Sequence, residues 1–172
     1  MYYMAYNHQI LTRTALLLAL TLLFQSLRLF IPLPAVMSVF FIGSLVNACL
    51  LIAVDCAGIK SAITIAILAP IIAYFQQLLF MPIFIMPIAI GNILYVLIFT
   101  LKGKWSYWLA VGMAAVIKTS FLYASFLWLT AFIAMPSSVI KGIIFIMSWP
   151  QLVTAGLGGF IAFIIIKRIK CE

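Results

Sequence analysis

Acidic residues are almost absent from this sequence. Its 172 residues include only two of Asp and Glu, and charged residues of both signs make up 7%, against about 25% in a typical globular protein. These few charges cannot coat a soluble surface of this size. The hydrophobic residues, 68% of the chain, must therefore face lipid or other helices. Asp55 is predicted to lie at a helix end, where it would pair with Lys60. The chain therefore lacks the intramembrane carboxylate that a proton- or sodium-coupled carrier usually has.

Residues for enzymatic chemistry are equally scarce. The single histidine, His8, lies outside the predicted membrane core, and Cys49, Cys56 and Cys171 lack the CxxC or CxxH spacing of a metal site. There is no P-loop with which the chain could hydrolyse ATP, and no intramembrane acid–base pair. We therefore expect no enzymatic activity, no bound metal and no cofactor.

Long apolar runs are what the sequence has in abundance. They extend over about 19 to 28 residues, which suits membrane-crossing helices and exceeds the roughly 10 residues of a barrel strand. Pro70, Pro87 and Pro150 are predicted to kink three of these helices. The sequence thus predicts an all-α membrane protein, a single transmembrane domain over residues 1–172. Its six helices are expected at residues 10–30, 36–54, 61–80, 83–101, 106–133 and 143–166.

The positive charges orient this bundle. The net charge is +8, but the basic residues form no face interleaved with aromatic rings, so we expect no nucleic-acid partner. With six crossings, both termini lie on one side of the membrane. Because basic residues concentrate in cytoplasmic loops, seven charges against two place both termini in the cytoplasm. The seven are Arg13, Lys60, Lys102, Lys104, Lys167, Arg168 and Lys170, and the two are Arg28 and Lys141.

One charge lies inside a predicted helix. Lys118 is about 20 Å from the cytoplasmic end of the fifth helix at helical rise, too far for its side chain to reach the interface. It must meet a partner, water or a ligand, because a charge in hydrocarbon is costly. Two interpretations stay open. Lys118 either forms a structural pair with a carbonyl or an amide, or meets an anionic or acceptor group of a substrate.

Uncharged polar residues gather in the outer half of the predicted bundle. Asn92 is expected about 15 Å and Gln151 about 12 Å from the outer ends of their helices. Asn47 lies deeper, where interhelical hydrogen bonding is expected. Polar groups between aromatic walls suit a small-molecule pocket, although each aromatic residue could instead anchor a helix at the interface. The predicted substrate-binding residues are Lys118, Asn92, Gln151, Gln76, Gln77, Tyr74, Tyr95, Tyr123 and Trp149.

Small residues give a further pattern in the first predicted helix. Ala15 and Ala19 lie one turn apart, and such small-xxx-small spacing lets another helix approach closely. A six-helix chain of this length with this alanine pair resembles the substrate-binding S component of an energy-coupling factor (ECF) vitamin transporter. The segments around Gly91-Asn92, Lys118 and Pro150-Gln151 are similar to those of poorly assigned members. The sequence does not match the riboflavin, thiamine, biotin or folate types.

This resemblance implies a role that the spacing alone does not. An S component lies in the bacterial plasma membrane and captures a vitamin or related micronutrient from outside. It then associates with a membrane coupling subunit and two cytoplasmic ATPases. The resemblance implies that Ala15 and Ala19 contact the coupling subunit, and that the pocket lies in the outer half.

Two other functions stay open. The chain could be a structural scaffold subunit of a cell-shape or cell-wall assembly, in which Lys118 and Asn92 would only pack. It could also be a self-contained facilitator that transports without ATP.

Overall fold

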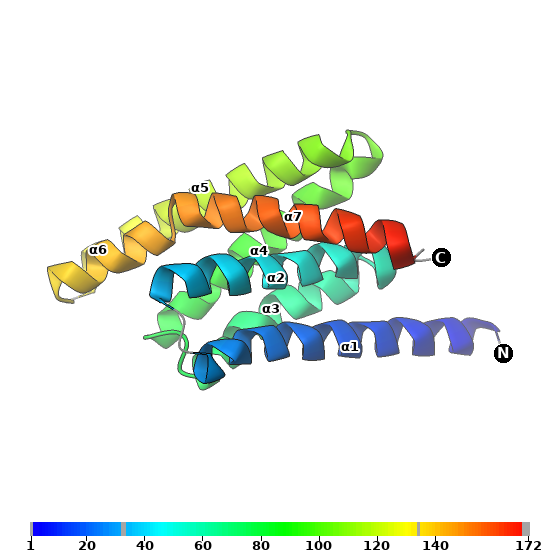
Figure 1. Ribbon diagram of the computed structural model, residues 1–172, viewed down its shortest axis with the longest axis horizontal. Coiled ribbons are helices and arrows are strands. Elements are labelled where there is room, and N and C mark those ends of the chain that lie inside the picture. Colours follow the sequence, from blue (N-terminus) through cyan, green and yellow to red (C-terminus); the bar gives the residue numbers. More distant parts are fainter. Residues whose placement is uncertain (1, 32–33, 134, 170–172) are drawn as a thin grey trace.

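The structure is a computed structural model that describes residues 2–31, 34–133 and 135–169, and every regular element within them is helical (Figure 1). The predicted all-α class is therefore confirmed. Lys170, one of the charges counted above, lies outside the described residues. The elements are α1 (Tyr2–Phe30), α2 (Ala35–Cys56), α3 (Ile59–Phe75), the 3-10 helix η1 (Pro82–Phe84), α4 (Ile85–Phe99), the 3-10 helix η2 (Thr100–Gly103), α5 (Tyr107–Phe132), α6 (Ser137–Ile146) and α7 (Trp149–Ile169).

Within the part of the chain that the structure describes, five helical segments are long and apolar enough to cross a membrane. The chain is therefore a multi-pass helical bundle, as predicted. The third predicted helix is shorter than expected, because α3 has only 17 residues, at the lower limit of roughly 17 to 25 for a crossing helix. The five segments are His8–Phe30, Met37–Cys56, Pro82–Gly103, Tyr107–Phe132 and Ser137–Ile169.

The early end of α3 has a local cause. The amide of Gln77 donates to the carbonyl of Tyr74, and that of Leu78 donates to the carbonyl of Ala73, both at 2.9 Å. These two bonds form a Schellman motif, which ends a helix on a residue of positive φ. Gln77 holds that position with a φ of 59°, where glycine is usual. The apolar pattern up to residue 80 does not show this turn, so the predicted end was wrong.

The last predicted helix is divided into α6 and α7, and α6 begins earlier than residue 143. Pro150 has no amide hydrogen for the carbonyl of Ile146, so the ladder is broken just before it, at Met147 and Ser148. The side chain of Gln151 replaces the missing donor, with its Nε2 3.4 Å from the Ile146 oxygen. The predicted kink at Pro150 is thus confirmed, and its position is at the start of α7.

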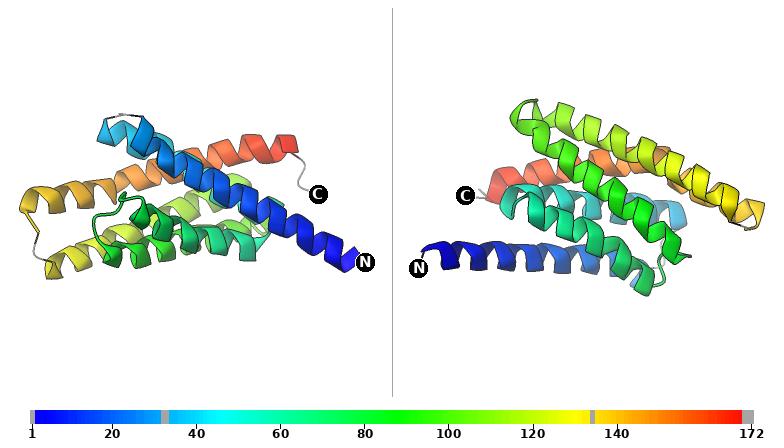
Figure 2. Two further views of the ribbon diagram at one scale, coloured as in Figure 1. Left: turned by 90° about the horizontal axis from the view of Figure 1, so that it is seen from below. Right: turned by 180° about the vertical axis from the view of Figure 1, so that it is seen from behind.

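The helices form a closed circuit around the bundle. Contacts run from α1 to α2, α7, α5, α4, α3 and back to α1 (Figure 2). The start of α1 and the finish of α7 lie at the same end, here called the terminal end, and α6 lies at the opposite, distal end (Figure 1).

Two glycines let α7 pack closely against α2 and α5. A Cβ on Gly158 would lie 2.6 Å from the Cβ of Asn47 and 2.9 Å from the Ser44 carbonyl oxygen. A Cβ on Gly159 would lie 2.3 Å from Val111 on α5. Only hydrogen at these positions lets α7 approach both neighbours, which is how small residues drive packing between membrane helices.

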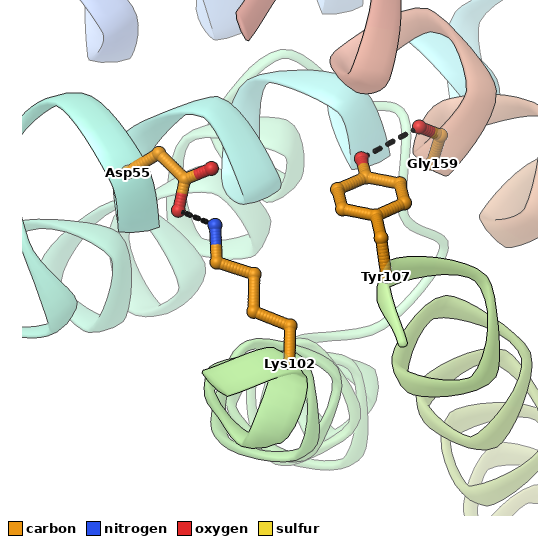
Figure 3. A network of polar contacts seen from close by, with 4 residues as sticks. All are labelled: Asp55, Lys102, Tyr107 and Gly159. Carbon is orange, nitrogen blue, oxygen red and sulfur yellow. Dashed lines mark hydrogen bonds and ion pairs between the residues drawn. The ribbon is translucent and has the colours of Figure 1, made fainter. Parts of the chain in front are cut away.

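Polar contacts tie the helices together at and near the terminal end. Asp55 of α2 pairs with Lys102 of η2, and the Tyr107 hydroxyl donates to the Gly159 carbonyl at 2.8 Å (Figure 3). Arg13 Nη1 also donates to the Cys56 carbonyl at 3.0 Å. The predicted pairing of Asp55 with Lys60 was wrong, because the end of α4 approaches α2 more closely in space than the sequence indicates.

The apolar core is also uneven along the bundle. In the half toward the terminal end, Leu50, Leu51 and Ile65 of α2 and α3 pack without exposure against Val96 and Phe99 of α4. A smaller cluster at the distal end joins η1, α5 and α6. The buried amides of Gln25, Asn47 and Asn92 lie between the two clusters with the buried Lys118.

Replacing Gly158 by alanine tests the glycine contact. We expect Gly158→Ala to lower stability by about 1 to 3 kcal/mol, because the added methyl group meets the backbone of α2. Gly156→Ala, in the same helix with open space around it, should be neutral or stabilising by up to about 1 kcal/mol. Thermal unfolding of the purified variants in detergent measures both, and equal effects would argue against the close contact.

The turn after α3 gives a second prediction. Gln77→Gly should stabilise the protein by about 1 kcal/mol, since glycine adopts the positive φ without a steric cost. The neighbouring change Gln76→Gly, at a residue of negative φ, should destabilise it. The same unfolding measurement decides, and a loss of stability in Gln77→Gly would contradict the assignment of the turn.

Candidate functional site

A cavity of about 180 Å³ lies between the two apolar clusters. Residues of all the long helices, and the junction of α6 and α7, contribute to its wall. Two of these side chains are cationic and four are amides, and the others are mostly apolar. The lining consists of Gln25, Arg28, Ser38, Val39, Ile42, Gly43, Val46, Asn47, Pro70, Ala73, Leu78, Leu79, Ile88, Asn92, Lys118, Ile146, Met147 and Gln151.

Lys118 is the charged group at the deep end of the cavity. The Lys118 side chain extends from the middle of α5 and is only 3% exposed. Its Nζ donates to Asn47 Oδ1 at 2.5 Å and lies 5.0 Å from the centroid of the Tyr95 ring. A buried ammonium group has three hydrogens to donate. Asn47 accepts one of them, and the face of the Tyr95 ring stabilises the charge without accepting a conventional hydrogen bond. Lys118 thus has donor capacity left toward the cavity.

Asn47 joins three helices at this point. While its Oδ1 accepts from Lys118 of α5, its Nδ2 lies 3.4 Å from Thr154 Oγ1 of α7. The predicted interhelical hydrogen bonding of Asn47 is therefore confirmed. Its place in the cavity wall was missed, although the glycine at position 158, which brings α7 against Asn47, is a sequence signal that could have indicated it.

Asn92 and Gln25 are buried amides with unused hydrogen-bonding capacity. Asn92, on α4, is 5% exposed, and its amide has no hydrogen-bond partner among the described residues. Gln25, on α1, is 9% exposed. Its Nε2 lies 3.3 Å from the Ala69 carbonyl oxygen, while its Oε1 is buried without a partner. Because buried polar groups are normally hydrogen-bonded, both amides indicate a ligand or water in the cavity.

Arg28 lies at the mouth of the cavity. Its Nε donates to Ser38 Oγ of α2 at 2.9 Å, and the side chain reaches solvent. The sequence indicated Arg28 only as an orienting charge. Its spacing of three residues from Gln25, which puts both on one face of α1, is the signal that could have placed it here.

The predicted site residues fall into two groups. Lys118, Asn92 and Gln151 line the cavity together, from three different helices. The other six do not line it. Tyr95 supports it from behind, because its ring lies under Lys118 and its hydroxyl donates to the Ala155 carbonyl at 2.6 Å.

The remaining five lie around the distal end or on the outer surface. Gln76 donates to Ser26 Oγ at 2.9 Å, and Gln77 belongs to the turn after α3. Tyr74 packs on its neighbour Phe75. Tyr123 is exposed on α5, and Trp149, also exposed, packs on Phe40 and Phe145. These aromatic positions suit the interface-anchoring interpretation.

The cavity carries positive charge without a local counterion. Asp55 is the one acidic residue that the structure describes, and it pairs with Lys102 at the terminal end. Arg28 and Lys118 therefore face the cavity without a carboxylate. No group of three His, Cys, Asp or Glu within the described ranges could hold a metal ion.

Comparison with protein-family models, with curated proteins and with solved structures finds no match to this chain.

A double-mutant cycle tests the pair at the deep end of the cavity. We expect Asn47→Leu to destabilise the protein by about 1 to 3 kcal/mol, because the buried ammonium loses its acceptor. Lys118→Met should cost less or even stabilise, since it removes the charge. In the combined variant the Asn47→Leu penalty should largely disappear. Thermal unfolding measures all four proteins, and additive effects would show that the two side chains do not interact.

Proposed function

We propose that this chain is the membrane-embedded substrate-binding subunit of an ECF-type importer in a bacterial plasma membrane. It captures a vitamin or related small micronutrient from outside and delivers it to a coupling subunit with two cytoplasmic ATPases. The observation that carries the proposal is the cavity, which is lined by the buried cation Lys118, the buried amide of Asn92 and the unpartnered Gln25 Oε1. Gln76 Oε1 and Thr119 Oγ1 are also buried without partners but do not line the cavity. An importer is favoured because Lys118, Asn92 and Gln25 gather around one space.

The proposed orientation uses six crossings. The sixth crossing is α3, a mainly apolar helix of 17 residues. It can cross where the turn at Gln77 and the η1 segment complete the span. The excess of basic residues at the terminal end supports an orientation with both termini in the cytoplasm. In this orientation the mouth of the cavity at Arg28 faces the outside.

The proposed contact with the coupling subunit lies on α1. Ala15 and Ala19 are both exposed, near the middle of α1, beside the exposed Leu11 and Leu16. An exposed pair of small residues one turn apart offers a close approach to a partner helix. Because these side chains are exposed rather than buried within the bundle, they are available to contact a partner helix.

A scaffold role is the second candidate, and one contact favours it. The hydrogen bond from Lys118 to Asn47 is what the structural interpretation of Lys118 expects. This contact does not account for the unused capacity of Asn92 and Gln25, which is why we place the importer first.

Co-purification with a coupling module tests the importer proposal. When the chain is co-expressed with an ECF coupling subunit and its two ATPases from the same genome, we expect a stable complex. Ala15→Trp with Ala19→Trp should reduce the recovered complex by about tenfold or more, because two large rings prevent close helix approach. Purified without the module, the double tryptophan variant should unfold at the wild-type temperature, since both positions are exposed.

The matched control is Ala124→Trp, an exposed alanine on α5 that should leave the complex intact. If the wild-type chain recovers no module, or if the control disrupts recovery as much as the α1 variant, the proposed partnership is wrong. ATP-independent uptake by the chain alone in liposomes would favour a facilitator instead.

A further inference from the structure

We propose that the cavity binds a small carboxylic acid with an apolar body of about one ring, its carboxylate held at Lys118 and Asn92. This inference rests on the proposed function, because it names the class of substrate that the same site takes. Four features of the described residues carry it, and each is independent of the family resemblance.

The first feature is charge. The cavity is lined by the cations Arg28 and Lys118 and, within the described chain, by no acidic side chain. Asp55, which could have neutralised one of them, is held by Lys102 near the other end of the bundle. A cavity with uncompensated positive charge in a low-dielectric surrounding favours an anion and rejects a cation.

The second feature is the hydrogen-bonding capacity at the deep end. Lys118 Nζ spends one hydrogen on Asn47, which leaves donors for another acceptor. The Asn92 amide, 5% exposed and without a partner, contributes further donors from the neighbouring α4. An anionic oxygen pair accepts from an ammonium and an amide together, and such charge-assisted bonds are the strong ones.

The third feature is the wall between the two cations. Val39, Ile42 and Val46 of α2 form one side of it, and Ile88 of α4 contributes another apolar side chain. These side chains cannot hydrogen-bond, so they suit a hydrocarbon or aromatic body rather than a sugar or a second charged group. Inorganic phosphate would leave this wall unused.

The fourth feature is size. A volume of about 180 Å³ is the space of roughly six waters, and a 150 Å³ apolar cavity is known to accommodate benzene. One ring with a carboxylate fills such a space, whereas a molecule of several rings does not. The cavity thus selects small acids before any specific contact is made.

Arg28 has a separate role at the mouth. Arg28 donates to Ser38 and Lys118 donates to Asn47, and both acceptors are on α2. Ser38 and Asn47 are nine residues apart, or about 14 Å along the helix. We infer that the carboxylate occupies the deep site and that Arg28 attracts the anion as it enters. The free amide oxygen Gln25 Oε1 provides an acceptor partway along, for a ring nitrogen–hydrogen or a hydroxyl.

Binding of matched acids and amides to the full-length protein in lipid nanodiscs tests the inference. The probes are benzoate, nicotinate and cyclohexanecarboxylate, each paired with its neutral carboxamide, together with inorganic phosphate. We expect at least one carboxylate to bind about tenfold or more tightly than its carboxamide, by calorimetry or thermal shift. Lys118→Met should weaken that binding by about 100-fold, as expected when one partner of a buried charged hydrogen bond is removed.

Three further variants make the result specific. Lys118→Gln retains a donor for Asn47 without the charge and should also lose the preference for the acid, which covers the case in which the methionine variant fails to fold. Lys141→Gln removes an exposed cation of α6 outside the cavity and should bind like wild type. Arg28→Gln should weaken binding by about threefold to tenfold at low salt, with the difference shrinking as salt screens the exposed charge.

The inference is overturned if carboxamides bind as well as acids, if phosphate alone binds, or if none of the three acids binds. A salt-independent loss in Arg28→Gln as large as that in Lys118→Met would likewise overturn the assignment of the carboxylate to Lys118. Recovery of the coupling module separates the two proposals. If the protein binds acids but recovers no coupling module, the importer proposal is wrong and the ligand class stands. If it recovers the module but binds no acid, the ligand class is wrong and the importer proposal stands.

Discussion

The hydrogen bond between Lys118 and Asn47 is the interaction on which the rest of the structure depends. A membrane interior offers no water to a buried ammonium, so the charge of Lys118 can exist there only if protein or ligand groups surround it. Asn47 can do so because α2 lies against α7, which in turn packs on α5, and the close approach of α7 to α2 depends on Gly158. The close packing of α7 on α2 and the hydrogen bond that stabilises the Lys118 charge therefore depend on each other.

This constraint explains why the bundle has two unlike halves. Toward the terminal end, α2 is buried by apolar side chains of α3 and α4. Toward the distal end, the proline at position 150 breaks the last helix and the turn at Gln77 ends α3 early. Shorter and broken helices leave space between them, and polar side chains from several helices face that space. The cavity is thus a consequence of where regular helix stops.

The sequence predicts the class of fold well and its interruptions poorly. Apolar runs locate the helices because the length needed to cross lipid is a physical requirement. The Schellman turn at Gln77 was not predictable, because glutamine carries no turn signal and the hydrogen bonds that form the motif are visible only in three dimensions. The partner of Asp55 was mistaken for a similar reason. Lys60 is near in sequence, but helix packing brings Lys102 to it.

For the site too, the sequence predicts one property and not another: how deep a residue lies in the bundle, but not which way its side chain points. Counting helical rise placed Lys118, Asn92 and Gln151 at similar depths, and these three do line one cavity. Depth alone cannot tell which face of a helix a residue occupies, so Tyr123 and Trp149 were included although they point outward. Arg28 and Gln25 were left out although they point inward. The cation at the mouth and the cation at the deep end belong to one cavity only because α1 and α5 face the same space. This long-range pairing places two cationic side chains around one cavity.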